Sequence, residues 1–137
     1  EMATAAMMGI SFTVVVTNNR GYGCINRLQM GTGSAEFNNL LTHAVQAQPS
    51  AIDFTAHAAS MGATSVKVAN IAELETALAR RGDMTGPYVI VIDTDPYPST
   101  PDGGSWWDVA VPEVSTRDEV NVKRAAYEAA IKERNAQ

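Results

Sequence analysis

Two runs of β-branched, uncharged residues constrain the fold of this chain more than any other feature. Residues 10–17 read ISFTVVVT and residues 88–92 read YVIVI, so neither run alternates strictly between apolar and polar side chains. Strands that are apolar on both faces are typical of a parallel sheet covered by helices on both sides. We therefore expect an α/β fold with a parallel sheet and helices on both faces, in which residues 10–17 form a central strand.

Segments with helical spacing lie before and between these runs, as an α/β fold requires. Residues 1–9 are typical of the end of a helix that stops at a glycine, and residues 50–61 carry a helical apolar face before Gly62. Residues 65–68 are expected to form a short strand.

Two later helices are indicated by capping signals at their N-termini. Asn70 with Glu73, and Thr116 with Glu119, have the spacing in which a cap and a side chain three residues later satisfy the first free N–H groups. We expect the first of these helices to end at Gly82. The apolar stripes along them are Ile71, Leu74 and Leu78 in the first, and Val120, Tyr127 and Ile131 in the second.

Size and charge narrow the class of protein. A chain of 137 residues is the length of one domain, and we treat residues 1–137 as a single domain with a C-terminal helix. The net charge of −5 argues against nucleic acid or an anionic membrane as a partner. The lone Cys24 excludes an internal disulfide and suits the cytoplasm, and no apolar run approaches the ~20 residues of a membrane-spanning helix. We expect a soluble domain.

Polar residues follow both apolar runs, where ligands bind in open α/β sheets. Residues 18–23, NNRGYG, follow the first run, and Asp93 and Asp95 follow the second. An asparagine oxygen and a carbonyl that glycine lets turn inward are suitable ligands for Mg²⁺, although such sites usually add a carboxylate and a phosphate. The alternative is that residues 18–21 form only a turn, and that the two aspartates serve turns or caps.

Residues 14–23, VVVTNNRGYG, resemble the second half of the cofactor signature of thiamine diphosphate-dependent enzymes. This resemblance implies the C-terminal cofactor-binding domain of that family, with the Asn19 side chain and the Gly21 carbonyl as Mg²⁺ ligands and Asn18 as part of the turn. The first half of the signature, a Gly-Asp-Gly, does not occur in this sequence. We therefore expect the aspartate ligand to lie upstream of Glu1, in an N-terminal part that this chain lacks.

Three residues just past the turn are also assigned to the cofactor by the resemblance. Cys24 and Ile25 lie where similar enzymes approach the thiazolium ring of the cofactor and the substrate. Tyr22 would lie against the diphosphate or pack on the sheet. Because free cysteines are among the most buried residues and no basic neighbour is evident, we interpret Cys24 as a small buried hydrophobe and not as a nucleophile.

Two longer stretches narrow the resemblance. Residues 19–29, NRGYGCINRLQ, and residues 103–115, GGSWWDVAVPEVS, are similar to the trihydroxycyclohexanedione hydrolases of inositol catabolism. The similarity covers nearly the whole chain and implies a C–C bond hydrolase that opens the ring of a cyclic 1,2-dione. In such enzymes the activating glutamate lies on another domain, usually of a partner subunit. We therefore expect no catalytic residue in this chain, an inactive fragment, and a homodimer or homotetramer as the assembly.

Other notable residues have structural interpretations. Trp106 and Trp107 are expected to pack in a core or subunit contact, because large aromatic residues mostly contribute buried area. His43 and His57 are too far apart in sequence for the i, i+4 spacing of a metal site, and we expect neither to be catalytic. The charges of the last helix are typical of a solvated face.

Two other functions stay open at this point. One is a related thiamine diphosphate lyase or synthase of the acetolactate type, which would differ in substrate residues outside this chain. The other is a non-catalytic α/β binding or assembly module that retains the fold without the cofactor. A Gly-Asp-Gly immediately upstream of Glu1 would favour catalysis over the module.

Overall fold

The computed structural model describes residues 1–48, 51–98 and 108–136 of the chain, in two compact units. The first, which we call the sheet unit, comprises Glu1–Asn19 and Gln48–Asp95. The second, which we call the α2–α5 unit, comprises Arg20–Ala47 and Pro96–Gln137. Trp106 and Trp107 lie outside the described residues, so their role stays a prediction.

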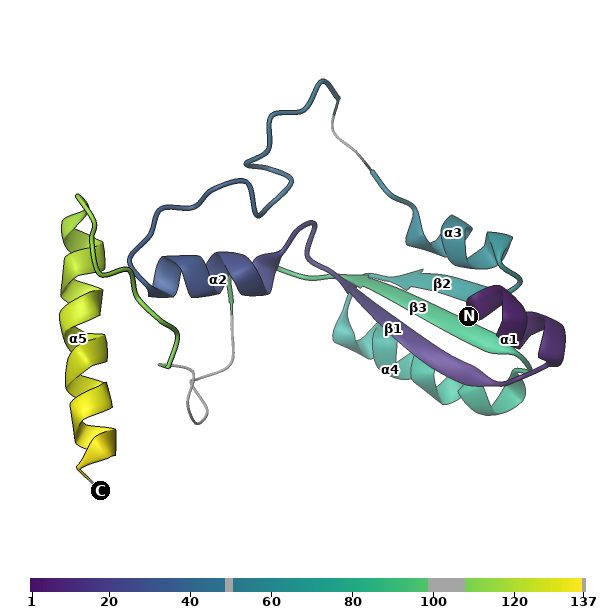
Figure 1. Ribbon diagram of the computed structural model, residues 1–137. Coiled ribbons are helices and arrows are strands. Elements are labelled where there is room, and N and C mark those ends of the chain that lie inside the picture. The colour runs from purple at the N-terminus through teal and green to yellow at the C-terminus, as the bar shows by residue number, and fades with distance from the viewer. Residues whose placement is uncertain (49–50, 99–107, 137) are drawn as a thin grey trace. The chain divides into compact units, whose positions relative to one another are not determined.

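The sheet unit contains three parallel strands in the order β1-β3-β2, with bounds β1 Phe12–Asn18, β2 Thr64–Val68 and β3 Pro87–Asp93 (Figure 1). The central strand is β3, which is buried from Pro87 to Ile92, as its apolar sequence predicts. The prediction of a central position for residues 10–17 is wrong for this sheet. Strand β1 lies at the edge, and Val15 is 40% exposed.

Helices cover both faces of this sheet, which confirms the predicted fold class. Helices α1 (Met2–Met8) and α3 (Phe54–Ser60) lie on one face, where Ala58 packs with Val89 and Val91 (Figure 1). Helix α4 (Ile71–Ala79) lies on the other, where Ala77 packs with Tyr88, Ile90 and Ile92. The alternating side chains of β3 therefore join two apolar clusters through one strand.

The predicted N-terminal cap of α4 is present. The side-chain oxygen of Asn70 accepts a hydrogen bond from the Glu73 amide at 2.9 Å, and the Glu73 carboxylate accepts one from the Ala69 amide at 2.8 Å. The helix ends at Ala79, before a 3₁₀ turn (η1, Arg80–Asp83), and not at Gly82.

The predicted apolar stripe of α4 is only partly correct. Ile71 is 65% exposed and Leu78 is also exposed, whereas Leu74 and Ala77 pack toward the sheet. The sheet contacts a face that is rotated from the predicted stripe, because spacing alone does not specify which side of a short helix meets its neighbour.

One end of α1 and one end of α3 also follow local signals. Helix α1 ends at Met8, and the residue that caps its C-terminus is Gly9, whose φ of 65° is the left-handed conformation that glycine adopts readily. Helix α3 begins at Phe54, later than predicted, because the Asp53 carboxylate caps it and accepts from the amides of Thr55 and Ala56, each at 2.9 Å.

The α2–α5 unit consists of helices α2 (Gly23–Gly31) and α5 (Asp118–Asn135) and the irregular segments beside them. Its buried apolar residues include Leu40, Val111 and Val120. Backbone packs closely on backbone here: a Cβ on Gly33 would lie 2.5 Å from the Glu119 carbonyl oxygen. Apart from the isolated bridge at Leu40, residues 32–47 contain no helix or strand.

The N-terminus of α5 differs from the predicted capping box of Thr116 and Glu119. The cap residue is Arg117, and it makes no side-chain capping hydrogen bond. The Ser115 hydroxyl oxygen instead accepts from the Arg117 amide at 3.1 Å, which stabilises the turn before the helix.

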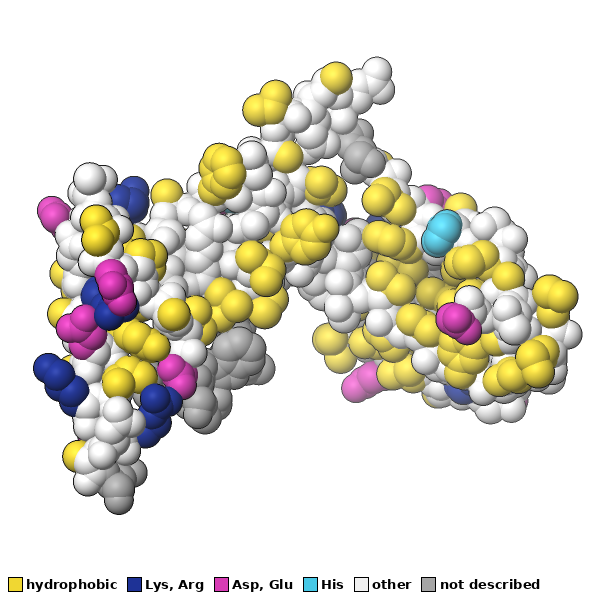
Figure 2. All heavy atoms as spheres, viewed as in Figure 1, with side chains coloured by type: hydrophobic (Ala, Val, Ile, Leu, Met, Phe, Trp, Pro, Cys, Tyr) yellow, Lys and Arg dark blue, Asp and Glu magenta, His cyan; other side chains and the backbone are white. Residues whose placement is uncertain are grey.

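Charged side chains of both signs gather over α5, as a solvated face requires (Figure 2). Arg124 donates to Glu128 at 2.8 Å and to the Val111 carbonyl at 2.8 Å, and the hydrogen bond to Glu128 raises the pKa of Arg124. Arg134 pairs with Asp108 at 2.6 Å. No helix in the described residues is both long enough and apolar enough to span a membrane.

Candidate functional site

The carboxyl-terminal edge of the sheet carries a polar network that joins all three strands. Asn18 is paired in register with Asp93, and its Nδ2 donates to Asp93 Oδ1 at 3.0 Å. Lys67 Nζ lies 2.9 Å from Asp93 Oδ2, and the Thr94 amide donates to the Asn18 carbonyl at 3.0 Å. Interpreting Asn18 as turn alone is therefore wrong, because it is the last residue of β1 and ties β1 to β3.

A shallow pocket opens at this edge, within the sheet unit. Its lining includes Asn18, Lys67 and Val91 from the strands, and Asp53 and Thr55 from the start of α3. The hydrogen bond from the Thr55 hydroxyl and then that from the Ala56 amide lower the pKa of Asp53, which favours a charged carboxylate. The pocket combines one cationic and one anionic side chain where α/β sheets bind ligands.

Asn19 is the last residue of the sheet unit and is half-buried directly after β1. Arg20, the first residue of the α2–α5 unit, has a φ of 56°. A left-handed conformation is unfavourable for a residue with a Cβ, and such strain is often found at functional sites. This left-handed residue separates the two predicted ligands, Asn19 and Gly21, in the chain.

Glycine is required at position 21 because a distant backbone segment approaches it closely, which the sequence does not reveal. It forms an antiparallel bridge with Leu40, whose two hydrogen bonds run from the Tyr22 amide to the Asn39 carbonyl at 2.7 Å and from the Leu41 amide to the Arg20 carbonyl at 3.0 Å. A Cβ at position 21 would lie 2.5 Å from the Asn39 oxygen. Only glycine allows the segment of residues 39–41 to approach so closely.

The three predicted cofactor neighbours lie at the start of α2. Tyr22 is the N-cap residue, and Tyr22, Cys24 and Ile25 are all exposed. The prediction of a buried Cys24 is wrong, because Gly23 and Asn26 occupy the buried side of this first turn. The exposed side of the turn thus carries the residues that the resemblance assigns to the cofactor.

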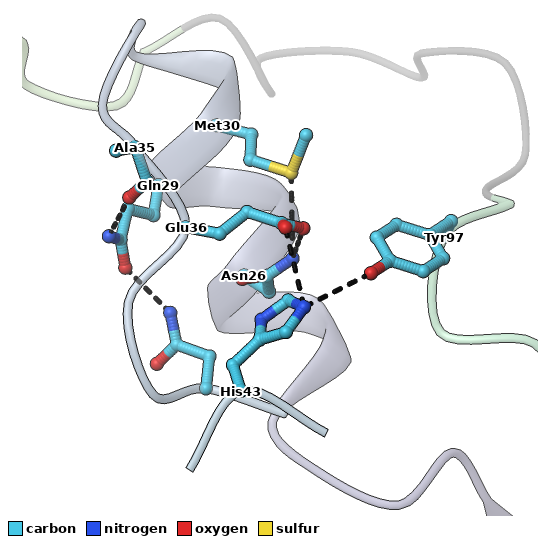
Figure 3. Close-up of polar contacts among 8 residues, drawn as sticks. Asn26, Gln29, Met30, Ala35, Glu36, His43 and Tyr97 are labelled. Atoms are coloured by element: carbon cyan, nitrogen blue, oxygen red, sulfur yellow. Dashed lines mark hydrogen bonds and ion pairs between the residues drawn. The ribbon is translucent and has the colours of Figure 1, made fainter. Parts of the chain in front are cut away.

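Sequence reasoning missed a polar cluster on the buried side of α2, shown in Figure 3. Asn26 is fully buried, and its Nδ2 donates to Glu36 Oε1 at 2.9 Å. His43 Nε2 lies 3.4 Å from Glu36 Oε2 and 3.4 Å from the Tyr97 hydroxyl. A lone asparagine beside the apolar Ile25 is the only hint that the sequence offers. His57, in α3, lies in the other unit.

The predicted metal ligands are suited to a hard cation. The Asn19 amide and the Gly21 carbonyl both offer neutral oxygen atoms, which Mg²⁺ accepts. No group of three or more His, Cys, Asp or Glu that could hold a metal occurs in the part of the chain that the structure describes. The donors therefore fit part of a magnesium site to which a diphosphate would add the anionic oxygens.

A comparison with known protein families shows the family to which this chain belongs. Residues 1–92 match the family described as thiamine pyrophosphate enzyme, C-terminal TPP binding domain. The chain belongs to this thiamine pyrophosphate enzyme family. The match includes β1, the turn, α2 and all but the last residue of β3, and it supports thiamine diphosphate as the cofactor.

Several similar curated proteins share one enzyme name. The chain is 35% identical over 133 residues to the 3D-(3,5/4)-trihydroxycyclohexane-1,2-dione hydrolase of Geobacillus thermodenitrificans, covering 93% of this chain and 20% of the relative. It is 34% identical over 137 residues to 3D-(3,5/4)-trihydroxycyclohexane-1,2-dione hydrolase 2 of Bacillus cereus, covering 96% and 21%. The chain thus spans about a fifth of the length of the curated relatives it matches.

Proposed function

We propose that this chain is the diphosphate-anchoring part of a thiamine diphosphate- and Mg²⁺-dependent C–C bond hydrolase that opens the ring of trihydroxycyclohexane-1,2-dione in inositol catabolism. The observation that carries this proposal is the extent of the similarity. The alignments with the hydrolases cover 93–96% of the chain and so continue beyond residue 92, where the general family match ends. This continuation favours the hydrolase over other activities of the family.

The proposed roles within this chain are those of an anchor. The Asn19 side chain and the Gly21 carbonyl ligate Mg²⁺, and the exposed start of α2 contacts the cofactor through Tyr22, Cys24 and Ile25. Bound thiamine diphosphate would supply the carbanion chemistry, while the protein supplies binding and orientation. The Asn18–Asp93 hydrogen bond holds the end of β1, and Asn19 is the next residue in the chain.

The rest of the site is proposed to come from outside this chain. The carboxylate ligand of the metal and the glutamate that activates the cofactor are assigned to other parts of a longer protein and to a second subunit of a cytoplasmic homodimer or homotetramer. Two neutral oxygens hold Mg²⁺ weakly without such a carboxylate. We expect the chain alone to bind thiamine diphosphate and Mg²⁺ weakly or not at all. Calorimetry that gave micromolar affinity would contradict this division of the site.

A graft tests the function directly. This chain would replace the matching segment of the Geobacillus thermodenitrificans hydrolase, and the folded graft would be assayed for cofactor retention and for opening of the cyclic dione. We expect both activities, and we expect the Asn19→Ala graft to need more Mg²⁺ for cofactor retention. A folded graft that retains cofactor without opening the ring would favour a related lyase or synthase. A folded graft that retains no cofactor would favour a non-catalytic module.

A further inference from the structure

Helix α2 and the loop that follows it are joined by hydrogen bonds made by polar side chains of the helix. Besides the hydrogen bond from Asn26 to Glu36, Gln29 Nε2 donates to the Ala35 carbonyl and Gln29 Oε1 accepts from Asn39 Nδ2 at 2.6 Å. Asn26 and Gln29 lie three residues apart, so both project from one side of α2 toward the loop. Two side chains of one helix thus contact residues 35, 36 and 39, and Figure 3 labels the first two of these residues.

The same loop makes the backbone bridge around Gly21. The Tyr22 amide donates to the carbonyl of Asn39, whose side chain is bonded to Gln29. The Leu41 amide donates to the Arg20 carbonyl two residues further along the loop. Gly21 is therefore enclosed between two hydrogen bonds to a loop segment whose own position depends on the side chains of α2.

The buried Asn26 is a costly way to fill its position. Its Oδ1 and the Nδ1 of His43 are buried without a hydrogen-bond partner among the described residues. An unpartnered buried polar atom is destabilising, and an apolar side chain of similar volume at position 26 would remove one of them. Stability alone does not account for an asparagine here, whereas the bond to Glu36 does.

We infer that Asn26 and Glu36 are positioning residues that fix the loop against Arg20–Gly21–Tyr22 and so orient the Gly21 carbonyl for the metal. The hydrogen bond between them connects α2 to the loop. The backbone bridge at Leu40 then connects the same loop to Gly21. The metal role rests on the proposed function. The restraint on residues 20–22 does not, and it can be measured without any ligand.

Amide hydrogen exchange of the whole chain tests the restraint. Glu36→Leu removes the acceptor of the Asn26 bond, whereas Glu36→Gln keeps an oxygen at that position. We expect Glu36→Leu and Asn26→Leu to speed exchange of the Tyr22 and Leu41 amides about tenfold, the effect of losing one hydrogen bond to a charged group. Exchange in β3 should stay unchanged, and Glu36→Gln should behave almost like the parent chain.

Thermal unfolding separates positioning from simple stabilisation. Asn26→Leu should change the melting temperature little while it loosens the bridge, because removal of the unpartnered Oδ1 offsets part of the lost hydrogen bond to Glu36. The inference is overturned if the Tyr22 and Leu41 amides exchange at the parent rate in both leucine variants. Equal loosening by Glu36→Gln and Glu36→Leu would also overturn it, since the Asn26 acceptor would then not matter.

Magnesium dependence in the graft described above tests the consequence for the metal. Glu36→Leu should raise the Mg²⁺ concentration for half-maximal cofactor retention severalfold, and Glu36→Gln should restore it. If the parent graft retains no cofactor, the proposed function fails while the exchange result still decides the restraint. If the graft retains cofactor with unchanged Mg²⁺ dependence in Glu36→Leu, the positioning of Gly21 fails and the proposed function stands.

Discussion

The interactions that stabilise the interior of the sheet unit differ from those that stabilise the interior of the α2–α5 unit. In the sheet unit, β3 is buried along its length, and its side chains join an apolar cluster on each face. In the α2–α5 unit, Asn26 is as buried as any core residue, and glycine backbones at positions 21 and 33 lie against other backbone segments. Burial of apolar area is distributed and tolerant, whereas close approaches and hydrogen bonds fail at single atoms. The unit with the less tolerant architecture carries Gly21 and the predicted cofactor neighbours.

The largest effect is expected in the core of the sheet unit. Ile90 is fully buried in the middle of β3, so Ile90→Ala should lower the free energy of unfolding by about 2–5 kcal/mol. Ile71→Ala is the matched control, because Ile71 is mostly exposed and its truncation should change stability by less than about 0.5 kcal/mol. Urea unfolding would measure both, and similar losses in the two variants would contradict the assigned core.

Gly21→Ala should cause the next largest loss, and it should be confined to the α2–α5 unit. The new Cβ would collide with backbone atoms of Asn39 and Leu40, at an expected cost of about 1–3 kcal/mol. Hydrogen exchange should show loosening at Leu41 with β3 unaffected. Gly31→Ala is the control, since a Cβ there meets nothing within 4 Å. Equal loosening by both alanines would show that the close approach at Gly21 is unimportant.

Helix capping provides a smaller contrast between the units. Asn70→Ala removes a cap whose side-chain oxygen accepts from the Glu73 amide, and it should lower stability by about 1 kcal/mol. Thr116→Ala alters a residue with the same capping sequence signal, but α5 makes no side-chain capping hydrogen bond, so little change is expected. Thermal denaturation of both variants checks this, and a comparable loss for Thr116→Ala would restore the predicted capping box.

Backbone strain at Arg20, the first residue of the α2–α5 unit, should be detectable as a gain in stability when glycine is placed there. Arg20 has a left-handed backbone, so Arg20→Gly should be more stable than Arg20→Ala by about 1 kcal/mol. The comparison is with alanine because both variants lose the same side-chain contacts and differ only at Cβ. A melting temperature for Arg20→Ala equal to or above that of Arg20→Gly would argue against the strain.

The smallest expected effect is a dependence on pH at the start of α3. The pKa of Asp53 is lowered in the folded chain, chiefly by the hydrogen bond from Thr55. A lowered folded pKa means that the stabilisation is fully present above the unfolded value, near 3.8, and is lost as the pH falls through the lower folded value. Exchange of the α3 amides should therefore speed up below this range, whereas Asp53→Asn should abolish that dependence without removing the cap.

Local signals predicted most of the sheet unit. The apolar run at residues 88–92 and the Asn70–Glu73 pair act through neighbours in sequence, so β3 and the start of α4 could be anticipated. The edge position of β1 could not, because the number of strands that flank it depends on distant segments. The same reason explains why the exposure of Ile71 was missed.

The candidate site was predicted less completely. The resemblance pointed to Asn19 and Gly21, and their roles as metal ligands stay predictions. The contact of Gly21 with Leu40 and the bond from Asn26 to Glu36 arise where the chain folds back on α2. The sequence of an irregular loop has no periodicity that predicts such contacts, since each depends on the path of the loop in the folded chain.

By itself, the sequence determined that this protein is an α/β chain with a buried parallel strand and the asparagine-rich turn of a thiamine diphosphate enzyme. These properties follow from residue type and from spacing over a few positions, so they can be predicted without knowing how the chain packs. Only the tertiary structure decided that Asn18 ties β1 to β3, that Cys24 is exposed and that Gly21 must lack a side chain. Those properties depend on which distant backbone lies within a few ångströms, and that distance is a consequence of the fold as a whole.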